Sequence, residues 1–200
     1  MRAAFTFTWI RRRKTRRALL LALTATLTSA GQFAVASPAA TRTASTTTFV
    51  SKEHGYSLAV PGSKARWIFV PARVGWTAGS LHPNDPQFDT LTDFPTGRFF
   101  IVGARKLPAH STLAEWTRSF LSSHALACRR TSRISRSTLA GVAARSYTFT
   151  CSDAYGIGID AVHGRRGYFM VLSAYGAGRV GPAHRREFEV ARRSFRFVHH

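Results

Sequence analysis

The residues that could do chemistry are few, and their spacing matches no catalytic motif. The 200-residue chain holds nine carboxylates, eight histidines and two cysteines. It contains no G-x-S-x-G nucleophile elbow, no phosphate loop ending in Gly-Lys-Ser/Thr, no H-E-x-x-H and no C-x-x-C. We therefore expect a protein that is not an enzyme and that uses no metal or cofactor.

Three aspartates, Asp85, Asp89 and Asp93, follow one another at a spacing of four. Calcium loops usually place their oxygen ligands at alternate positions, and Pro86 and Phe88 interrupt this segment. We expect solvated turn aspartates here rather than a calcium site. The histidines other than the terminal pair are scattered singly, which favours turn or solvent positions over metal ligands.

Cys128 and Cys151 lie at the two ends of a segment whose pattern predicts a hairpin. Polar residues run from Cys128 to Ser137, Gly141 marks a bend, and apolar residues alternate on the return strand. A hairpin that turns about residues 139–140 places Cys128 directly opposite Cys151. Facing Cα atoms in antiparallel strands lie about 4.5–5.5 Å apart, which a disulfide can span. The alternative is two unrelated buried thiols.

Two groups of side chains could bind a partner. Residues 73–95 form an irregular segment rich in Gly, Pro, Asn and Asp, and aromatic residues in such a loop can anchor an interface. The alternative is a loop folded back over a sheet. Four arginines on the last predicted helix could bind phosphate or carboxylate groups, or could form an ordinary solvated face. The candidate binding residues are Trp76, Phe88, Phe94, Arg185, Arg186, Arg192 and Arg193.

Period-two alternation of apolar residues predicts most of the strands. The stretch SKEHGYSLAVP predicts a tight hairpin, because Gly55 can adopt the positive φ of the turn and Pro61 ends the ladder. Residues 99–104 are a continuous apolar run, typical of a central strand covered on both faces. Further strands are expected at 67–70, 157–161, 168–172 and 195–197.

Two helices are predicted. The stretch STLAEWTRSFL opens with a capping box formed by Thr112 and Glu115, and its apolar residues share one face to about Ser123. A second helix begins at Pro182, since proline suits the first helical position. Strands in hairpins with few helices indicate an α+β fold built on an antiparallel β-sheet flanked by helices.

The N-terminal segment predicts export. Residues 1–36 combine a basic stretch, an apolar run and the small-x-small pattern Ala34-Val35-Ala36, which is typical of a secretory signal peptide. The stretch TRRALL also resembles a twin-arginine signal, and an uncleaved anchor is the alternative. Residues 37–48 predict a flexible linker, and residues 49–198 a single domain. We expect a secreted, periplasmic or cell-envelope protein, in which a disulfide is permitted.

The composition is strongly basic. The chain has 29 Lys and Arg against nine Asp and Glu, a formal net charge of +20. Seven positives and no acid lie in the predicted leader, which leaves 22 positives, nine acids and a net charge of +13. Such a charge attracts anionic lipid, acidic polymers or an acidic protein face. Export and the lack of a base-stacking aromatic motif argue against nucleic acid as the partner.

Several stretches resemble PsbP-like domains. GYSLAVPGSKARW resembles their first hairpin, STLAEWTRSFL their middle helix, and LAGVAARSYTFT their Gly-containing hairpin. GYFMVLSA and EFEVARRSFRF are similar to their last strand and helix, so the resemblance covers residues 49–197. It implies a PsbP-like α/β/α sandwich that docks to other proteins, since the relatives include extrinsic photosystem subunits, a Ran-binding nuclear import factor and bacterial envelope adaptors. The long 73–95 segment and the two cysteines depart from that pattern.

These observations favour an exported, non-enzymatic binding or adaptor domain that docks to an envelope protein or an anionic surface. Basic faces would steer the encounter, and the loop that holds Trp76 would supply apolar contact. Membrane contact would be peripheral at most. The alternative is a small-molecule or lipid carrier with a pocket under the 73–95 loop, and a hydrolase ranks third.

Overall fold

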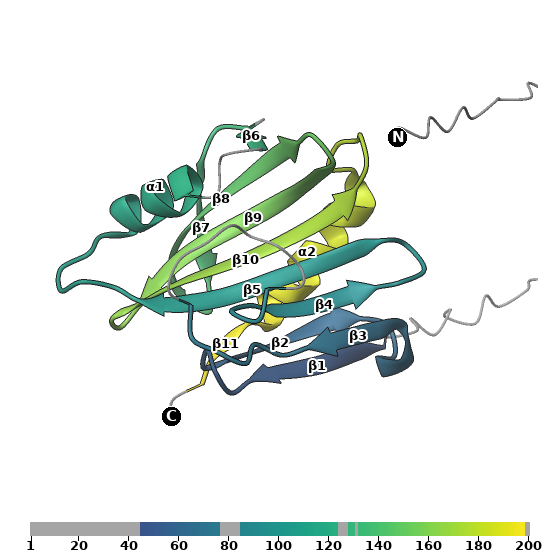
Figure 1. The fold of residues 1–200 in the computed structure, drawn as a ribbon, viewed down its shortest axis with the longest axis horizontal. Helices are drawn as coiled ribbons and strands as arrows, with labels where there is room; N and C mark the ends of the chain where they lie inside the picture. The colour runs from purple at the N-terminus through teal and green to yellow at the C-terminus, as the bar shows by residue number, and fades with distance from the viewer. Residues whose placement is uncertain (1–44, 77–84, 124–127, 131, 199–200) are drawn as a thin grey trace, which may run out of the picture. The chain divides into compact units, whose positions relative to one another are not determined.

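Strands dominate the fold, because apolar and polar residues alternate along much of the chain. The computed structural model describes residues 45–76, 85–123, 128–130 and 132–198. Within these ranges the chain forms two antiparallel sheets and two α-helices (Figure 1). The predicted α+β class is confirmed, although two sheets take the place of the one that was expected.

The smaller sheet has the order β1-β2-β11 and contains β1 (Thr46–Ser51), β2 (Tyr56–Pro61) and β11 (Arg196–Phe197). Gly55 has a φ of +69° in the turn between β1 and β2, as the hairpin pattern predicts. β1 begins at Thr46, before the predicted domain start at Phe49, because its β-branched threonines pair with the end of β2. The predicted leader and most of the predicted linker lie outside the described residues.

The larger sheet has the order β3-β4-β5-β10-β9-β8-β6, and β7 pairs with β8. Its strands are β3 (Trp67–Val70), β4 (Asp89–Asp93), β5 (Arg98–Lys106), β6 (Cys128–Arg130), β7 (Ser135–Leu139), β8 (Val142–Cys151), β9 (Ala154–His163) and β10 (Arg166–Tyr175). β4 falls inside the 73–95 segment that was predicted to be irregular. Leu91 is the one large apolar residue of β4, so β4 has no apolar periodicity of its own. The strand forms because it pairs with β3 on one side and β5 on the other.

Two α-helices accompany the sheets, α1 (Leu113–Ser123) and α2 (Pro182–Ser194), together with a short 3-10 turn, η1 (Lys64–Arg66). The predicted capping box is present at α1: the Thr112 amide donates to Glu115 Oε2 at 2.8 Å, and the Glu115 amide donates to Thr112 Oγ1 at 3.2 Å. Within the described ranges, neither helix has the length and apolarity that a membrane-spanning helix requires.

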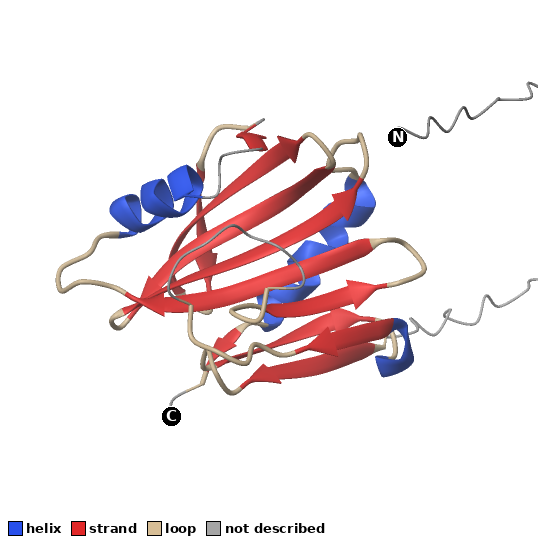
Figure 2. Cartoon of the chain, in the orientation of Figure 1, coloured by secondary structure: helices blue, strands red, loops and turns tan. Residues whose placement is uncertain are grey.

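Both faces of the larger sheet are buried. Successive residues of its central strands point to opposite sides, so they contribute to different cores. Tyr168 and Met170 of β10 share one core with Phe188 of α2 and with the smaller sheet. Phe169, between them, belongs to a second core with Trp116 of α1. The two helices therefore pack against different faces of the larger sheet (Figure 2).

The hairpin that carries the cysteines turns one residue later than predicted. Ala140 and Gly141 form the turn with φ values of +47° and +83°. Between the paired positions Arg130–Phe149 and Ser135–Ser146, the chain has four residues on the β6–β7 side and two on the β8 side. This bulge shifts the register by two positions, so that Cys128 still faces Cys151. The predicted turn about residues 139–140 is therefore wrong, and the predicted facing is observed.

Candidate anion-binding cleft

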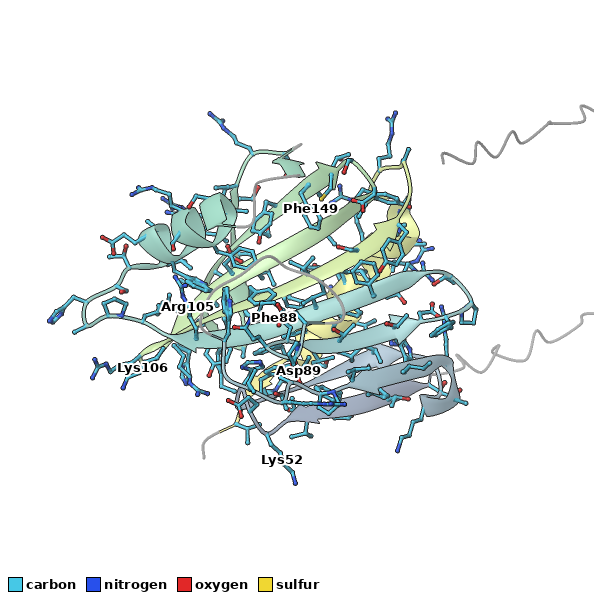
Figure 3. All side chains as sticks on the ribbon, in the orientation of Figure 1. Lys52, Phe88, Asp89, Arg105, Lys106 and Phe149 are labelled. Carbon is cyan, nitrogen blue, oxygen red and sulfur yellow. The ribbon has the colours of Figure 1, made fainter. Side chains whose placement is uncertain are left out.

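A cleft of about 460 Å³ lies where β5 ends and β10 begins. Glu53 and His54 of the β1–β2 turn line one side, and residues 74–76 line another. Residues 104–106 of β5 and Arg166 of β10 complete the lining. Figure 3 shows Arg105 and Lys106 together near this end of β5. Lys106 and Arg166 meet here because they are direct cross-strand partners in the ladder between β5 and β10.

The lining of the cleft is positively charged. Arg105, Lys106 and Arg166 are its cations, and Glu53 is its carboxylate. In the part of the chain that the structure describes, none of these three cations forms an ion pair. Arg166 instead donates to the carbonyl of His54 at 3.2 Å, which holds the β1–β2 turn against the sheet. The cleft thus keeps an excess of positive charge that internal carboxylates do not neutralise.

Aromatic rings hold Arg105 in place. Its guanidinium carbon lies 5.1 Å from the ring centroid of Trp76 and 5.2 Å from that of Trp116, within cation–π range. Its Nη2 also donates to Ser119 Oγ of α1 at 3.1 Å. These contacts orient the cation at the cleft before any ligand arrives, which lowers the entropy cost of binding.

The aromatic residues predicted as binding anchors divide into two kinds. Trp76 is 6% exposed and Phe88 is 1% exposed, and both belong to the core beneath α1. These two residues pack over the sheet, which agrees with the alternative that the sequence left open. Burial keeps both rings from acting as exposed docking anchors, although Trp76 still lines the cleft. Phe94 is 71% exposed in the turn between β4 and β5, and it keeps its candidate role.

His54 lies in the wall of the cleft and is 1% exposed. Its Nε2 is 3.0 Å from the carbonyl oxygen of Gln87. Burial lowers the pKa of His54, and the nearby Asp89 carboxylate opposes that effect. The ring is therefore largely uncharged at neutral pH. His54 takes a turn position, one of the two expected of the histidines, but the turn closes over it and buries it.

The aspartates that were weighed as calcium ligands have internal partners. Asp89 accepts hydrogen bonds from the Tyr56 hydroxyl and the Ala72 amide, both at 2.8 Å. Asp93 accepts from Arg66 Nε at 3.0 Å and Nη2 at 2.6 Å. Burial alone would raise the pKa of Asp93, but hydrogen bonds from Arg66 and Thr96 outweigh it and lower the pKa.

Asp89 and Asp93 are both buried, so the prediction of solvated turn aspartates is wrong for them. The described residues contain no group of three or more His, Cys, Asp or Glu side chains placed to hold a metal ion. These carboxylates instead tie the strands at the edge of the larger sheet to their neighbours.

The four candidate arginines of α2 do not form one surface. Arg185 and Arg186 are exposed. Arg192 is engaged internally, because its Nη2 lies 2.7 Å from Glu189 Oε2 and its Nη1 donates to the carbonyl of Thr138 at 2.9 Å. Arg193 is exposed and lies 3.6 Å from Glu189. The first two arginines remain the stronger candidates for an external partner.

Comparison with known proteins identifies the architecture. No protein-family model and no curated protein sequence matches the chain. The solution structure of cyanobacterial PsbP (CyanoP) from Synechocystis sp. PCC 6803 is similar, with a TM-score of 0.52 over 82% of this chain and 99% of that chain. The chain has a PsbP-like fold. The two sequences are 12% identical, so the likeness concerns the fold alone.

The sequence did not reveal the cleft of this PsbP-like domain. Arg166 falls between the strands predicted at 157–161 and 168–172, and Arg105 and Lys106 merely follow an apolar strand. The available signal was a basic residue at the end of each strand. It could not be used, because the pairing of β5 with β10 joins positions 60 residues apart.

Proposed function

We propose that this PsbP-like domain is an exported, non-enzymatic binding domain that docks to an anionic surface or an envelope protein. The supporting observation is the unequal placement of its charges. Four of the nine carboxylates are buried. They are Asp89, Asp93, Asp160 and Glu187. The surface is therefore more basic than the composition alone indicates, and such a surface attracts anions over a Debye length of about 8 Å at physiological salt.

The proposal includes the maturation of the chain. Residues 1–36 would direct export, and the mature domain would reside outside the cytoplasm. Cys128 and Cys151 would form a disulfide there, which their facing positions in the ladder support. The two helices, packed on different faces of the larger sheet, are consistent with the α/β/α sandwich of PsbP-like domains.

Phe94, Arg185 and Arg186 form the proposed docking surface. Arg98 at the start of β5 forms an ion pair with Glu187 of α2 at 3.0 Å, which brings the β4–β5 turn and the first turns of α2 to the same end of the domain. An exposed aromatic ring at the same end of the domain as two exposed cations can combine apolar contact with electrostatic attraction. This end of β5 is opposite the end that carries the cleft.

The docking proposal can be tested by sedimentation with vesicles. We expect the domain to bind phosphatidylglycerol vesicles better than phosphatidylcholine vesicles, and to be released as salt rises. The Arg185→Ser/Arg186→Ser variant should lose about tenfold or more in affinity, because each cation near an anionic membrane is worth about 1 kcal/mol. The Lys52→Ser/Arg73→Ser variant removes the same charge from exposed positions next to the cleft, at the other end of the domain, and serves as the control. Equal losses in both variants would reject the docking surface, and the absence of binding to anionic vesicles and to envelope extract would reject docking.

A second candidate function is a small-molecule carrier, and the cleft favours it. Its volume of about 460 Å³ lies within the range of about 300–1,000 Å³ that is usual for small-molecule sites. Residues 74–76, at the start of the 73–95 segment, form part of its wall. Native mass spectrometry of protein purified from the cell envelope of its own organism should then show a bound ligand. Repeated absence of such a ligand would argue against a carrier.

A further inference from the structure

We infer that the cleft binds the phosphate group of a small organic molecule, with Lys106 and Arg166, which share one face of the ladder, as its direct cationic contacts, and Arg105, on the other face, as a further charge of its lining. This inference deepens the second candidate function, the carrier, by naming the chemical class of its ligand. It does not depend on the docking surface, which lies at the other end of β5.

The first argument is the pairing of like charges. Lys106 and Arg166 are direct partners across the ladder between β5 and β10. Facing residues in a ladder have Cβ atoms about 4.5–5.5 Å apart, and like charges in such a pair are destabilising. In the described part of the chain neither cation has a carboxylate partner that would relieve the repulsion. An anion bound between them would convert this repulsion into two attractions.

The second argument is the amount of charge. The lining has three cations and one carboxylate, so the cleft has a net charge of +2 when His54 is neutral. A phosphate monoester carries about −1.5 to −2 at pH 7 and offers three strong acceptor oxygens. A carboxylate has a single charge and two oxygens, so it would neutralise half of the excess. The charge of the cleft therefore matches a phosphate monoester better than a carboxylate.

The third argument is preorganisation. The guanidinium of Arg105 is held by the rings of Trp76 and Trp116, and that of Arg166 by the carbonyl of His54. Two of the three cations are thus positioned by the fold itself, which lowers the entropy cost of binding. Lys106 is exposed and flexible, so it can adjust to the ligand as a point charge.

The fourth argument is the rest of the lining. The cleft is larger than a phosphate ion requires, and Trp76, Val74 and Ala104 give it apolar walls. A ligand that fills it would carry an aromatic or aliphatic body beside its phosphate. Glu53 stands on the rim, where its negative charge would oppose the ligand. A free phosphomonoester and a lipid headgroup share this chemistry, and the experiment separates them.

The test uses phenyl phosphate as the probe, with affinity measured by calorimetry and by the indole signals of the tryptophans in NMR spectra. We expect saturable binding that shifts the Trp76 signal. Lys106→Gln should weaken binding about three- to tenfold, the usual loss for one exposed charge-assisted contact. The matched control is Lys64→Gln, which removes the same charge from η1 and should leave the affinity unchanged. Glu53→Gln should tighten binding.

Two further arms identify the source of the phosphate. Methyl phenyl phosphate, a diester with one charge, should bind more weakly than the monoester if the charge argument is right. Vesicles containing phosphatidic acid, a lipid phosphate monoester, that compete with phenyl phosphate would indicate a lipid headgroup, and vesicles that do not compete would indicate a soluble ligand.

The inference is overturned if phenyl phosphate does not shift the Trp76 signal, or if Lys106→Gln and Lys64→Gln weaken the binding of phenyl phosphate equally. Both lysines are exposed, so the variants should fold, and a thermal melt of each verifies this. Binding of phenyl phosphate without any co-purified ligand would reject the carrier and keep the site. If the natural protein binds phenyl phosphate but does not bind anionic vesicles, the docking surface alone is rejected.

Discussion

Cys128 lies directly opposite Cys151 in the antiparallel ladder between β6 and β8. The pairing does not come from a regular hairpin, because the turn at Ala140 and Gly141 alone would set the cysteines out of register. The bulge between β6 and β7 restores their alignment. A bulge that brings two cysteines into direct alignment is expected if their sulfurs are joined in a disulfide.

We predict that the mature protein contains a Cys128–Cys151 disulfide. Thiol titration in denaturant should find no free thiol before reduction and two after it. Cys128→Ser/Cys151→Ser should lower the free energy of unfolding by about 3 kcal/mol, because the cross-link restricts the unfolded chain over a loop of this length. Adding reductant should lower the free energy of unfolding of the natural protein by a similar amount and leave that of the double variant unchanged. Two reactive thiols in natively isolated protein would contradict the prediction.

The second prediction concerns Asp160, which is fully buried in β9 and accepts a hydrogen bond from the Tyr147 hydroxyl at 3.0 Å. Burial raises the pKa of Asp160 well above its usual value, and the hydrogen bond from Tyr147 opposes this only in part. The folded state therefore holds its proton more tightly than the unfolded state does. Stability is then lost as pH rises above the unfolded value of about 3.9, until the folded pKa is reached.

Asp160→Asn removes this titration and keeps an acceptor for Tyr147. We expect the variant to gain stability over the natural protein as pH rises from 4 to 8, by about 1.4 kcal/mol for each unit by which the fold raises the pKa. Urea unfolding at several pH values measures the difference. Asp153→Asn, in the exposed turn before β9, is the control for exchanging a carboxylate for an amide. A gain that does not change with pH would refute the prediction.

How far the fold could be predicted depends on how local each signal is. The capping box at Thr112 and Glu115 and the positive φ of Gly55 involve neighbouring residues, and both predictions are confirmed. β4 was missed because it has one large apolar residue, Leu91, and exists through its neighbours on both sides. A strand of this kind has no period-two pattern of its own.

The candidate site was harder to predict for the same reason. The residues around Trp76 have the composition of a loop, yet Trp76 belongs to the core. Trp116 of α1, 40 residues later in the chain, packs against its ring. The cleft requires Lys106 to meet Arg166, and no local pattern reports that pairing. Residue type could suggest that arginines bind anions, but only the strand order shows which of them stand together.

The third prediction concerns the contact between α1 and the sheet. A Cβ atom on Gly167 would lie 2.5 Å from Cδ2 of Trp116, and the Trp116 indole also donates to the carbonyl of Tyr168 at 3.0 Å. Gly167→Ala should therefore displace the ring and lower the free energy of unfolding by about 1–3 kcal/mol. Gly75→Ala is the control, since its Cβ would meet only the mobile end of Glu53, at 3.3 Å. Comparable losses in both variants, measured by urea unfolding, would show that the ring does not determine the cost.

The fourth prediction separates two adjacent arginines of α2. Arg192 links Glu189 to the carbonyl of Thr138 in β7, whereas Arg193 is 78% exposed and more distant from Glu189. Arg192→Gln should lower the free energy of unfolding by about 1 kcal/mol or more, since it removes a charge-assisted hydrogen bond between α2 and the sheet. Arg193→Gln should stay within about 0.5 kcal/mol of the natural protein, as is usual for exposed pairs.

The pH dependence of this loss provides a further check. The hydrogen bond from Arg192 lowers the pKa of Glu189, although burial opposes it, so the pair stabilises the fold when Glu189 is ionised. That contribution is present above the unfolded pKa of about 4.3 and is lost as pH falls through the folded value. The difference between Arg192→Gln and the natural protein should therefore shrink below about pH 4. A difference that is constant from acid to neutral pH would mean that Arg192 acts through packing and its bond to Thr138, and not through its charge on Glu189.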